Sequence, residues 1–253
     1  MCGAIPKHVE SLKLVSRRGT TASCTVLDIS SKEFKQESKG YYVATAGHLF
    51  TDRAMPFYNF AIHSKKGMVE FKAKDVMFDE LDPEICLIKV SREEVDELGI
   101  SPSSVSTEDC LDGQSIYVRG HTKLGSVVVR GNALGEAQAT TLTDELHARD
   151  EMIDDNGAQV TGSFLSQMCP RSRILADYAS GQLMSGSGVY SRLDDKWLGT
   201  HIMGGSLWRG GNIPTAEDVI HPHKLASYLI NAGTATRYAV FVPALHFLRK
   251  LLR

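Results

Sequence analysis

The chain has 253 residues, of which 42% are hydrophobic and 23% are charged, and its formal net charge is −2. These values are those of a globular protein with one large core or two small ones, and they argue against disorder over most of the length. The balanced charge excludes a global electrostatic attraction to nucleic acid or to a membrane surface.

The cysteines and the apolar runs restrict the class of protein further. The five cysteines are odd in number, widely spread and free of CxxC pairs, which argues against a disulfide framework or a zinc site. A reducing compartment fits this pattern best. The N-terminal stretch MCGAIPKHVESLK lacks the apolar core of a signal peptide, and no apolar run is long enough to span a bilayer.

Short runs rich in Val, Ile, Tyr and Thr recur along the chain between turn residues. In chain order they cover 22–30, 40–47, 68–78, 85–90, 115–120, 126–131, 188–193 and 196–204. This spacing predicts an all-β barrel or sandwich. Helical periodicity is expected in SREEVDELGI (91–100), HKLASYLINAG (223–233) and PALHFLRKLLR (243–253).

A polar stretch containing serine and proline, SPSSVSTEDC (101–110), divides the predicted strands into two groups. We therefore expect one strand-rich unit over 1–100, a second over 101–235 and a helical tail over 236–253. The charged region 140–172 carries few strand signals and is predicted to be a long surface excursion.

A histidine follows the predicted strand in YYVATAGHLF (41–50). A lone histidine at a strand end is most often a structural residue whose ring bonds a nearby carbonyl. Here the small residues Thr45, Ala46 and Gly47 let the backbone crowd around the imidazole and hold it at the strand end. This setting makes His48 a candidate general base.

An acidic residue precedes the strand ICLIKV in DELDPEICLIKV (79–90). Such an acid is commonly a solvated residue at a strand start. Its functional reading is a carboxylate that orients His48 and stabilises the imidazolium form. Glu84 directly abuts the apolar strand and is the first choice, and Asp82, which precedes a proline, is the alternative.

Two serines, Ser185 and Ser187, each precede a glycine in LADYASGQLMSGSGVYSR (175–192). A serine hydroxyl becomes a nucleophile only beside a base, and it needs backbone N–H groups that converge on the developing oxyanion. Glycine next to the serine supplies the unusual dihedral angles that such a loop requires. Gly/Ser turns are common, so this stretch alone is weak support for a nucleophile.

In the order His, acid, Ser-Gly, these segments follow the order of the chymotrypsin-type triad. TAGH (45–48) resembles the TAxH motif of chymotrypsin-like proteases, EICLIKV (84–90) resembles their acid-strand motif with Glu for Asp, and SGSGVY (185–190) resembles their S-G-x-P-V nucleophile motif with glycine for proline. WLGTHIMGG (197–205) is similar to the G-x-H-x-x-G strand of the polyprotein-processing main proteases of picornaviruses, potyviruses, arteriviruses and their relatives. The resemblance covers about residues 15–210.

The resemblance implies an all-β fold of two antiparallel six-stranded β-barrels, here with a C-terminal helical extension. It also implies a serine endopeptidase that forms an acyl-enzyme and needs no metal or organic cofactor. His48 would be the base, Glu84 its orienting acid and Ser185 the nucleophile. The backbone N–H groups of Ser185 and Leu183 would form the oxyanion hole, although the family usually has glycine at the position of Leu183.

The resemblance also implies a specificity pocket. In the viral enzymes the histidine of G-x-H-x-x-G reads a Gln or Glu side chain before the scissile bond, and here it would be His201. A Thr or Ser five residues before the nucleophile assists it, and that position is Ser180 if Ser185 is the nucleophile. The strand that follows, 202–205, is expected to pair with the extended substrate.

Ser187 remains the alternative nucleophile. Ser185 is favoured because S-G-S-G-V-Y matches the motif with one change and because Ser180 then falls at the pocket position. Ser187 is favoured by its shorter spacing to His201, which matches the picornavirus type. No cysteine takes the place of the serine, since Cys169, for example, is not followed by glycine.

The expected partner is a polypeptide, a viral polyprotein, in the reducing host cytoplasm or at membrane-associated replication sites. The basic and apolar tail PALHFLRKLLR either packs on the barrel or contacts a membrane surface or RNA. Two rival functions remain: a cellular protease of the same fold, which would not need His201, and an inactive barrel that acts as a binding or RNA-binding module. The sequence leaves the oligomeric state open.

Overall fold

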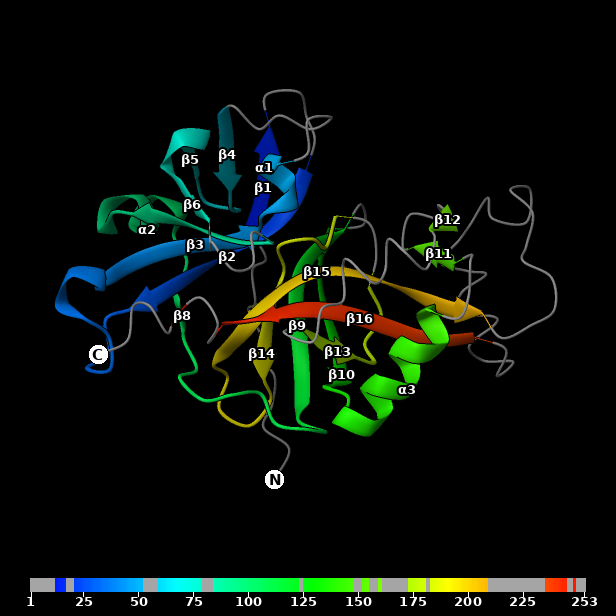
Figure 1. Cartoon of the computed structure of the whole chain (residues 1–253). Helices are drawn as coiled ribbons and strands as arrows, with labels where there is room; N and C mark the ends of the chain where they lie inside the picture. Colours follow the sequence, from blue (N-terminus) through cyan, green and yellow to red (C-terminus); the bar gives the residue numbers. More distant parts are fainter. Residues whose placement is uncertain are drawn as a thin grey trace.

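The computed structural model of the chain describes residues 12–16, 21–51, 59–78, 84–122, 125–147, 152–154, 159–160, 173–180, 183–208, 235–244 and 248. These residues form two curled, mainly antiparallel sheets that lie against each other (Figure 1). The strands that precede residue 105 belong to the first sheet, and those that follow it belong to the second.

The first sheet has the strand order β5-β4-β1-β2-β3-β7-β6, with β8 pairing in parallel with β2. Its other pairs are antiparallel. The strands are β1 (Leu12–Ser16), β2 (Thr21–Ile29), β3 (Gly40–Ala46), β4 (Asn59–His63), β5 (Met68–Lys72), β6 (Val76–Phe78), β7 (Ile85–Val90) and β8 (Ser103–Ser104). Two 3-10 turns interrupt this part of the chain, η1 (Gln36–Ser38) and η2 (Ala73–Asp75).

The second sheet has the strand order β10-β9-β14-β15-β11-β12, and β16 joins it by pairing with both β15 and β13. The strands are β9 (Ser115–Thr122), β10 (Gly125–Asn132), β11 (Met152–Asp154), β12 (Gln159–Val160), β13 (Ile174–Ala176), β14 (Gly188–Ser191), β15 (Trp197–Trp208) and β16 (Ala235–Pro243). In Figure 1 the long strands β15 and β16 run side by side across the molecule, as their register of paired residues requires.

The described helices are α1 (His48–Thr51), α2 (Arg92–Leu98) and α3 (Glu136–His147). The predicted helical turn at 91–100 is confirmed as α2. The Ser91 side chain accepts a hydrogen bond from the backbone of Glu94, whose carboxylate bonds back to the Ser91 N–H, and Gly99 ends the helix in the left-handed conformation. None of these described helices is long and apolar enough to cross a membrane.

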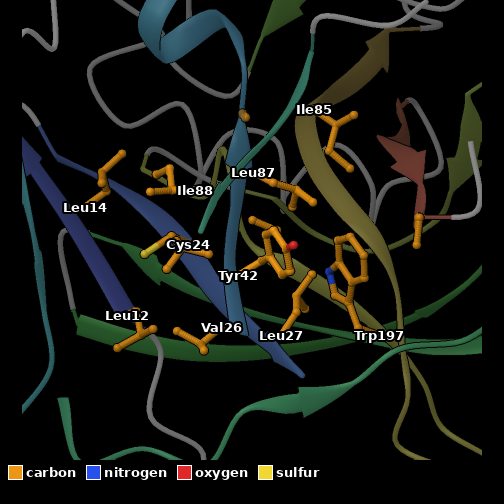
Figure 2. Close-up of a cluster of buried hydrophobic side chains, with 14 of the residues drawn as sticks. Leu12, Leu14, Cys24, Val26, Leu27, Tyr42, Ile85, Leu87, Ile88 and Trp197 are labelled. Atoms are coloured by element: carbon orange, nitrogen blue, oxygen red, sulfur yellow. The ribbon is translucent and has the colours of Figure 1, made fainter. Parts of the chain in front are cut away.

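The hydrophobic core lies inside each sheet and continues between the two sheets. One cluster of buried side chains comes mainly from the first sheet, and Trp197 of the second sheet joins it. Figure 2 shows part of this cluster, with Trp197 among side chains that include Leu27 and Tyr42. A second cluster, with Tyr178 and Met184 among its members, fills the second sheet. Packing across the interface therefore fixes one barrel against the other.

The predicted chymotrypsin-type pair of β-barrels is confirmed by these two curled sheets. Each sheet has eight strands within the described ranges, two more than the six predicted per barrel, and short strands such as β8 and β12 account for the difference. The boundary stretch 101–110 contains β8, which stays with the first sheet.

The predicted helical tail over 236–253 is wrong for its first part, because Ala235–Pro243 is strand β16. This segment, ATRYAVFVP, is rich in β-branched and aromatic residues, and its buried run from Tyr238 to Val242 is covered on both faces. Beyond it, Ala244 and Leu248 are helical. The other residues of the tail, and the predicted helix at 223–233, lie outside the described residues.

Candidate active site

His48 and Glu84 are joined by a hydrogen bond of 2.6 Å between Nδ1 and Oε2. The sheet itself brings them together, because β3 and β7 are antiparallel and Ala46 lies opposite Ile85. One residue further along each strand, the Gly47 N–H donates to the Glu84 carbonyl at 2.8 Å. The histidine side chain is 28% exposed and the carboxylate side chain 15% exposed, so solvent reaches the ring more easily than the carboxylate.

This pairing decides what the imidazole can do. A carboxylate bonded to Nδ1 keeps a proton on that nitrogen and leaves Nε2 free to accept one from a substrate-facing group. The same carboxylate stabilises the imidazolium that then forms. The alternative acid, Asp82, lies outside the described residues.

The loop that carries the two serines is a tight turn over residues 184–187. The Ser187 N–H donates to the Met184 carbonyl at 2.8 Å, and Gly186 has a φ of +89°, as the third residue of a type II turn requires. Met184, 2% exposed, anchors the turn in the core of the second barrel. The turn thereby holds Ser185 at its partly exposed apex.

Ser187 occupies a different environment from Ser185. Its side chain is completely buried, and its hydroxyl has no hydrogen-bond partner in the part of the chain that is described. A side chain on Gly120 of β9 would overlap this hydroxyl, so the two residues are in direct contact. Of the two candidate nucleophiles, Ser185 is the one that solvent can reach.

The serine turn is fastened to the first barrel through Ser23 of β2. The Ser23 N–H donates to the Ser185 carbonyl at 2.9 Å, and the Ser23 hydroxyl donates to the Leu183 carbonyl at 2.9 Å. In turn, the Thr45 hydroxyl donates to the Ser23 carbonyl at 2.8 Å. Because Thr45 precedes His48 by three residues, the serine turn packs against the strand that leads to the histidine.

The Ser185 hydroxyl donates to the carbonyl of Ile202 at 3.2 Å. Among the described residues no hydrogen bond joins it to His48. The structure therefore brings His48 and Glu84 into contact and places Ser185 on the adjoining turn, with its hydroxyl directed to β15.

Two backbone donors on this loop have no hydrogen-bond acceptor in the described part of the chain. Within the described ranges the N–H groups of Leu183 and Ser185 donate no hydrogen bond to the protein. Partly buried N–H groups are usually paired, so a free pair beside a serine can receive an anionic oxygen. Leu183 has a φ of +75°, the left-handed region that favours glycine. This conformation costs a leucine about 1–3 kcal/mol, and it is the one that glycine would adopt without strain.

His201 lies on β15, where it is 1% exposed, and its Nδ1 is 2.8 Å from the Tyr178 hydroxyl. Burial, assisted by the nearby charge of His48, lowers the pKa of His201 from 6.5 to about 3, so the ring is neutral at pH 7. A side chain on Gly204 would overlap the Ser180 hydroxyl, which places Ser180 directly against the same strand.

Two residues of this arrangement, Ser23 and Tyr178, are not among the residues predicted from the sequence. Tyr178 stands two positions before Ser180 in the same Gly/Ser-containing stretch, which is a weak signal for a pocket residue. Ser23 is a buried serine in β2, and its sequence position alone does not connect it to residues 183–185.

Thiol nucleophiles and metal ligands have little support in the described part of the chain. Cys24 and Cys86 are buried, and burial raises the pKa of both thiols. Burial also raises the pKa of Cys110, to about 11. These thiols are therefore protonated at pH 7 and poorly nucleophilic. Within the described ranges no three His, Cys, Asp or Glu side chains group as ligands for a metal ion.

Comparison of the fold with solved structures gives several similar chains. One is a chain in a structure from work on the coupled folding and binding of the intrinsically disordered Sesbania mosaic virus VPg protein, with a TM-score of 0.51, 12% identity, and coverage of 96% of this chain and 90% of that one. Another is the inactive form of the Rv3671c protease of M. tuberculosis, with a TM-score of 0.48, 14% identity, and coverage of 95% and 88%. A human pathogenic astrovirus serine protease has a TM-score of 0.45, 12% identity, and coverage of 84% and 93%.

The first of these similarities supports the fold. At 12% identity it gives no information on the activity of this chain. No family model and no curated protein matches the sequence.

Proposed function

We propose that the chain is a serine endopeptidase with His48, Glu84 and Ser185 as its catalytic triad. The observation that carries the proposal is the 2.6 Å hydrogen bond between His48 and Glu84 at a strand end that packs against the serine turn. A base oriented by a partly buried acid, beside a turn that carries an accessible serine, is the arrangement that nucleophilic catalysis requires. Ser185 is preferred to Ser187 because Ser187 is completely buried.

The reaction begins when the Ser185 hydroxyl leaves the Ile202 carbonyl and turns toward His48. Nε2 of His48 takes the hydroxyl proton while the serine oxygen attacks the substrate carbonyl carbon. The free N–H groups of Leu183 and Ser185 stabilise the negative charge that develops on the carbonyl oxygen. His48 then gives its proton to the leaving amine, and a water molecule, activated by the same ring, hydrolyses the acyl-enzyme.

The substrate is proposed to bind as an extended strand along β15. The stretch 202–204 of β15 has one edge without a strand partner among the described residues. On one side of this stretch lies His201, which is hydrogen-bonded to the serine turn, and on the other lies Gly205, which pairs with β11. The carbonyl of Ile202 already faces Ser185. A peptide paired there would bring its scissile bond beside the nucleophile.

We propose that the residue before the scissile bond is Gln or Glu, read by His201 with Ser180 beside it. In the tautomer that we propose, Nδ1 of the neutral ring accepts a hydrogen bond from the Tyr178 hydroxyl and Nε2 carries the proton. That N–H can then donate to a carboxamide or carboxylate oxygen. The resemblance of the motifs to viral main proteases further suggests a viral polyprotein as substrate and the host cytoplasm as location.

A second candidate function is an inactive barrel that serves as a binding module. It is favoured by one observation, the hydrogen bond from Ser185 to Ile202 in place of one to His48. In this case the site would bind a peptide or another partner without cleaving it.

A serine-directed fluorophosphonate distinguishes the two candidates. The endopeptidase is expected to form an adduct on Ser185 in the wild-type chain, to lose it in Ser185→Ala and to keep it in Ser187→Ala. A peptide library that varies the residue before the scissile bond over all amino acids is expected to show cleavage after Gln or Glu. An unlabelled wild-type chain that cleaves no Gln- or Glu-containing peptide would refute the endopeptidase, whereas an adduct on Ser187 would move the nucleophile.

A further inference from the structure

Ser23 connects the first barrel to both functional residues of the serine turn. It is completely buried in β2, yet it takes part in hydrogen bonds through its N–H, its carbonyl and its hydroxyl. The N–H binds the Ser185 carbonyl and the hydroxyl binds the Leu183 carbonyl. A buried hydroxyl costs free energy unless it is hydrogen-bonded, and at Ser23 these bonds are made.

The proton of the Ser23 hydroxyl has a defined direction. The hydroxyl oxygen accepts a hydrogen bond of 2.7 Å from the His121 N–H of β9. Its single proton can then go to the Leu183 carbonyl at 2.9 Å or to the His121 carbonyl at 3.4 Å. The shorter contact is the better hydrogen bond, so the proton is directed at Leu183.

The carbonyl that Ser23 holds belongs to a residue in a strained conformation. Leu183 has a φ of +75°, and its neighbour Met184 is locked in the core of the second barrel. The bond to Ser23 and the burial of Met184 thereby fix the peptide group on the C-terminal side of the Leu183 Cα. The direction of the Leu183 N–H depends on that same φ.

We propose that Ser23 is a positioning residue for the oxyanion hole: its hydroxyl holds Leu183 in the left-handed conformation that directs the Leu183 N–H toward the substrate carbonyl. The inference rests on the proposed function, because it assigns Ser23 a role in the same acyl-transfer step. Ser23 itself touches neither the substrate nor the reacting atoms. It acts across the barrel interface through the backbone of the serine turn.

A double-mutant cycle between Ser23 and Leu183 tests the role. Removing a donor of an oxyanion hole lowers kcat about 10²–10³-fold. Ser23 only positions such a donor and does not remove it, so we expect Ser23→Ala to lower kcat about tenfold. KM should stay within about twofold, because ground-state binding is unaffected. Glycine adopts a positive φ without help, so in a Leu183→Gly background the same Ser23→Ala change should alter kcat less than about twofold.

Two further variants separate this role from a general loss of stability. Ser106→Ala removes a nearly buried hydroxyl that bonds only within its own turn, to Glu108, and should leave kcat unchanged. Ser23→Cys fills the same space with a weak donor and should give an intermediate loss of kcat, which keeps the test available if Ser23→Ala does not fold. Circular dichroism and thermal melts confirm that each variant is folded before kinetics are measured.

The outcomes are distinct. A tenfold loss that disappears in the Leu183→Gly background supports the role of Ser23. An unchanged kcat in Ser23→Ala, or an equal loss in both backgrounds, overturns it while the wild-type activity stands. A wild-type chain that neither cleaves peptide nor reacts with the fluorophosphonate refutes the proposed function, and the role of Ser23 with it.

Discussion

Replacing Gly186 with alanine tests whether the serine turn is built as the structure shows. The added Cβ would overlap the Ser23 carbonyl oxygen and the Thr45 hydroxyl, and it would lie 3.0 Å from the Ser23 carbonyl carbon. The backbone φ of +89° is one that alanine rarely adopts. Both effects act at the contact that joins the serine turn to the first barrel, so the change should affect stability and activity together.

The two effects can be given rough sizes. The left-handed conformation costs alanine about 1–2 kcal/mol. Forcing an extra carbon into a packed interface typically costs about 1–3 kcal/mol, and neither neighbour here is the end of a flexible side chain. We therefore expect a total loss of about 2–5 kcal/mol in the free energy of unfolding, which lowers Tm by roughly 5–15 °C in a chain of this size.

Gly113 provides the matched control. It also has a positive φ, +72°, but a Cβ there would meet nothing within 4 Å. Gly113→Ala therefore carries the conformational cost without the overlap and should lower the free energy of unfolding by only about 1–2 kcal/mol. Thermal melts and peptide hydrolysis of the two variants decide the matter. If Gly186→Ala has the same Tm as Gly113→Ala and retains wild-type kcat, the turn does not pack against Ser23 and Thr45 as described.

Three other changes address the histidines and their partners. Glu84→Gln should lower kcat by about 10²–10⁴ in peptide hydrolysis, because the imidazolium loses its carboxylate, and a loss below tenfold would transfer the role to another acid such as Asp82. Tyr178→Phe removes one hydrogen bond from His201 and should raise KM for Gln-containing peptides about tenfold, and a loss confined to kcat would contradict a pocket role. The pKa of His201 is about 3 in the folded chain and 6.5 in the unfolded chain. Between these two pH values the unfolded chain binds a proton that the folded chain does not, so the free energy of unfolding is highest above pH 6.5 and falls as the pH is lowered toward 3. His201→Gln should therefore flatten the pH dependence of the free energy of unfolding between pH 6 and 4 by up to about 1.4 kcal/mol per pH unit in urea titrations, and parallel curves for the two chains would refute this.

Local signals account for most of the fold that the sequence predicts. The apolar run at 85–90 and the first part of the run at 188–193, up to Ser191, form strands because each fits a buried sheet position. Helix α2 was predictable because its cap residues, Ser91, Glu94 and Gly99, are all local. Helix α3 was missed, since its segment EAQATTLTDELH is mostly polar and has no strong apolar stripe.

Strand β16 was missed for a different reason. Its segment was grouped with the helical pattern of PALHFLRKLLR, which begins at its last residue. Periodicity does not distinguish a buried strand from a buried helix segment over a short, continuously apolar run such as 238–242. The pairing of β16 with both β15 and β13, which decides its conformation, is a long-range property.

Some residues of the candidate site could be predicted from local sequence, and others depend on long-range contacts. His48 and Glu84 could be paired from sequence because each stands at the end of its own apolar run and antiparallel neighbours bring those ends together. Ser23 and Tyr178 could not, because Ser23 contacts residues about 160 positions away and Tyr178 meets His201 across the second barrel. The contribution of Ser23 depends on how the two barrels pack, and that of Tyr178 on how the second barrel folds.

Leu183 shows why that packing matters for chemistry. A leucine where glycine is expected would ordinarily relax to a negative φ, yet here it keeps φ at +75°. Its carbonyl is held by Ser23 of the first barrel, while the adjacent Met184 is buried in the second. In our proposal, the direction of the Leu183 N–H is therefore set at the interface between the barrels. Substitutions that shift this interface should change kcat even when they lie far from His48, whereas substitutions within one barrel core should mainly change stability.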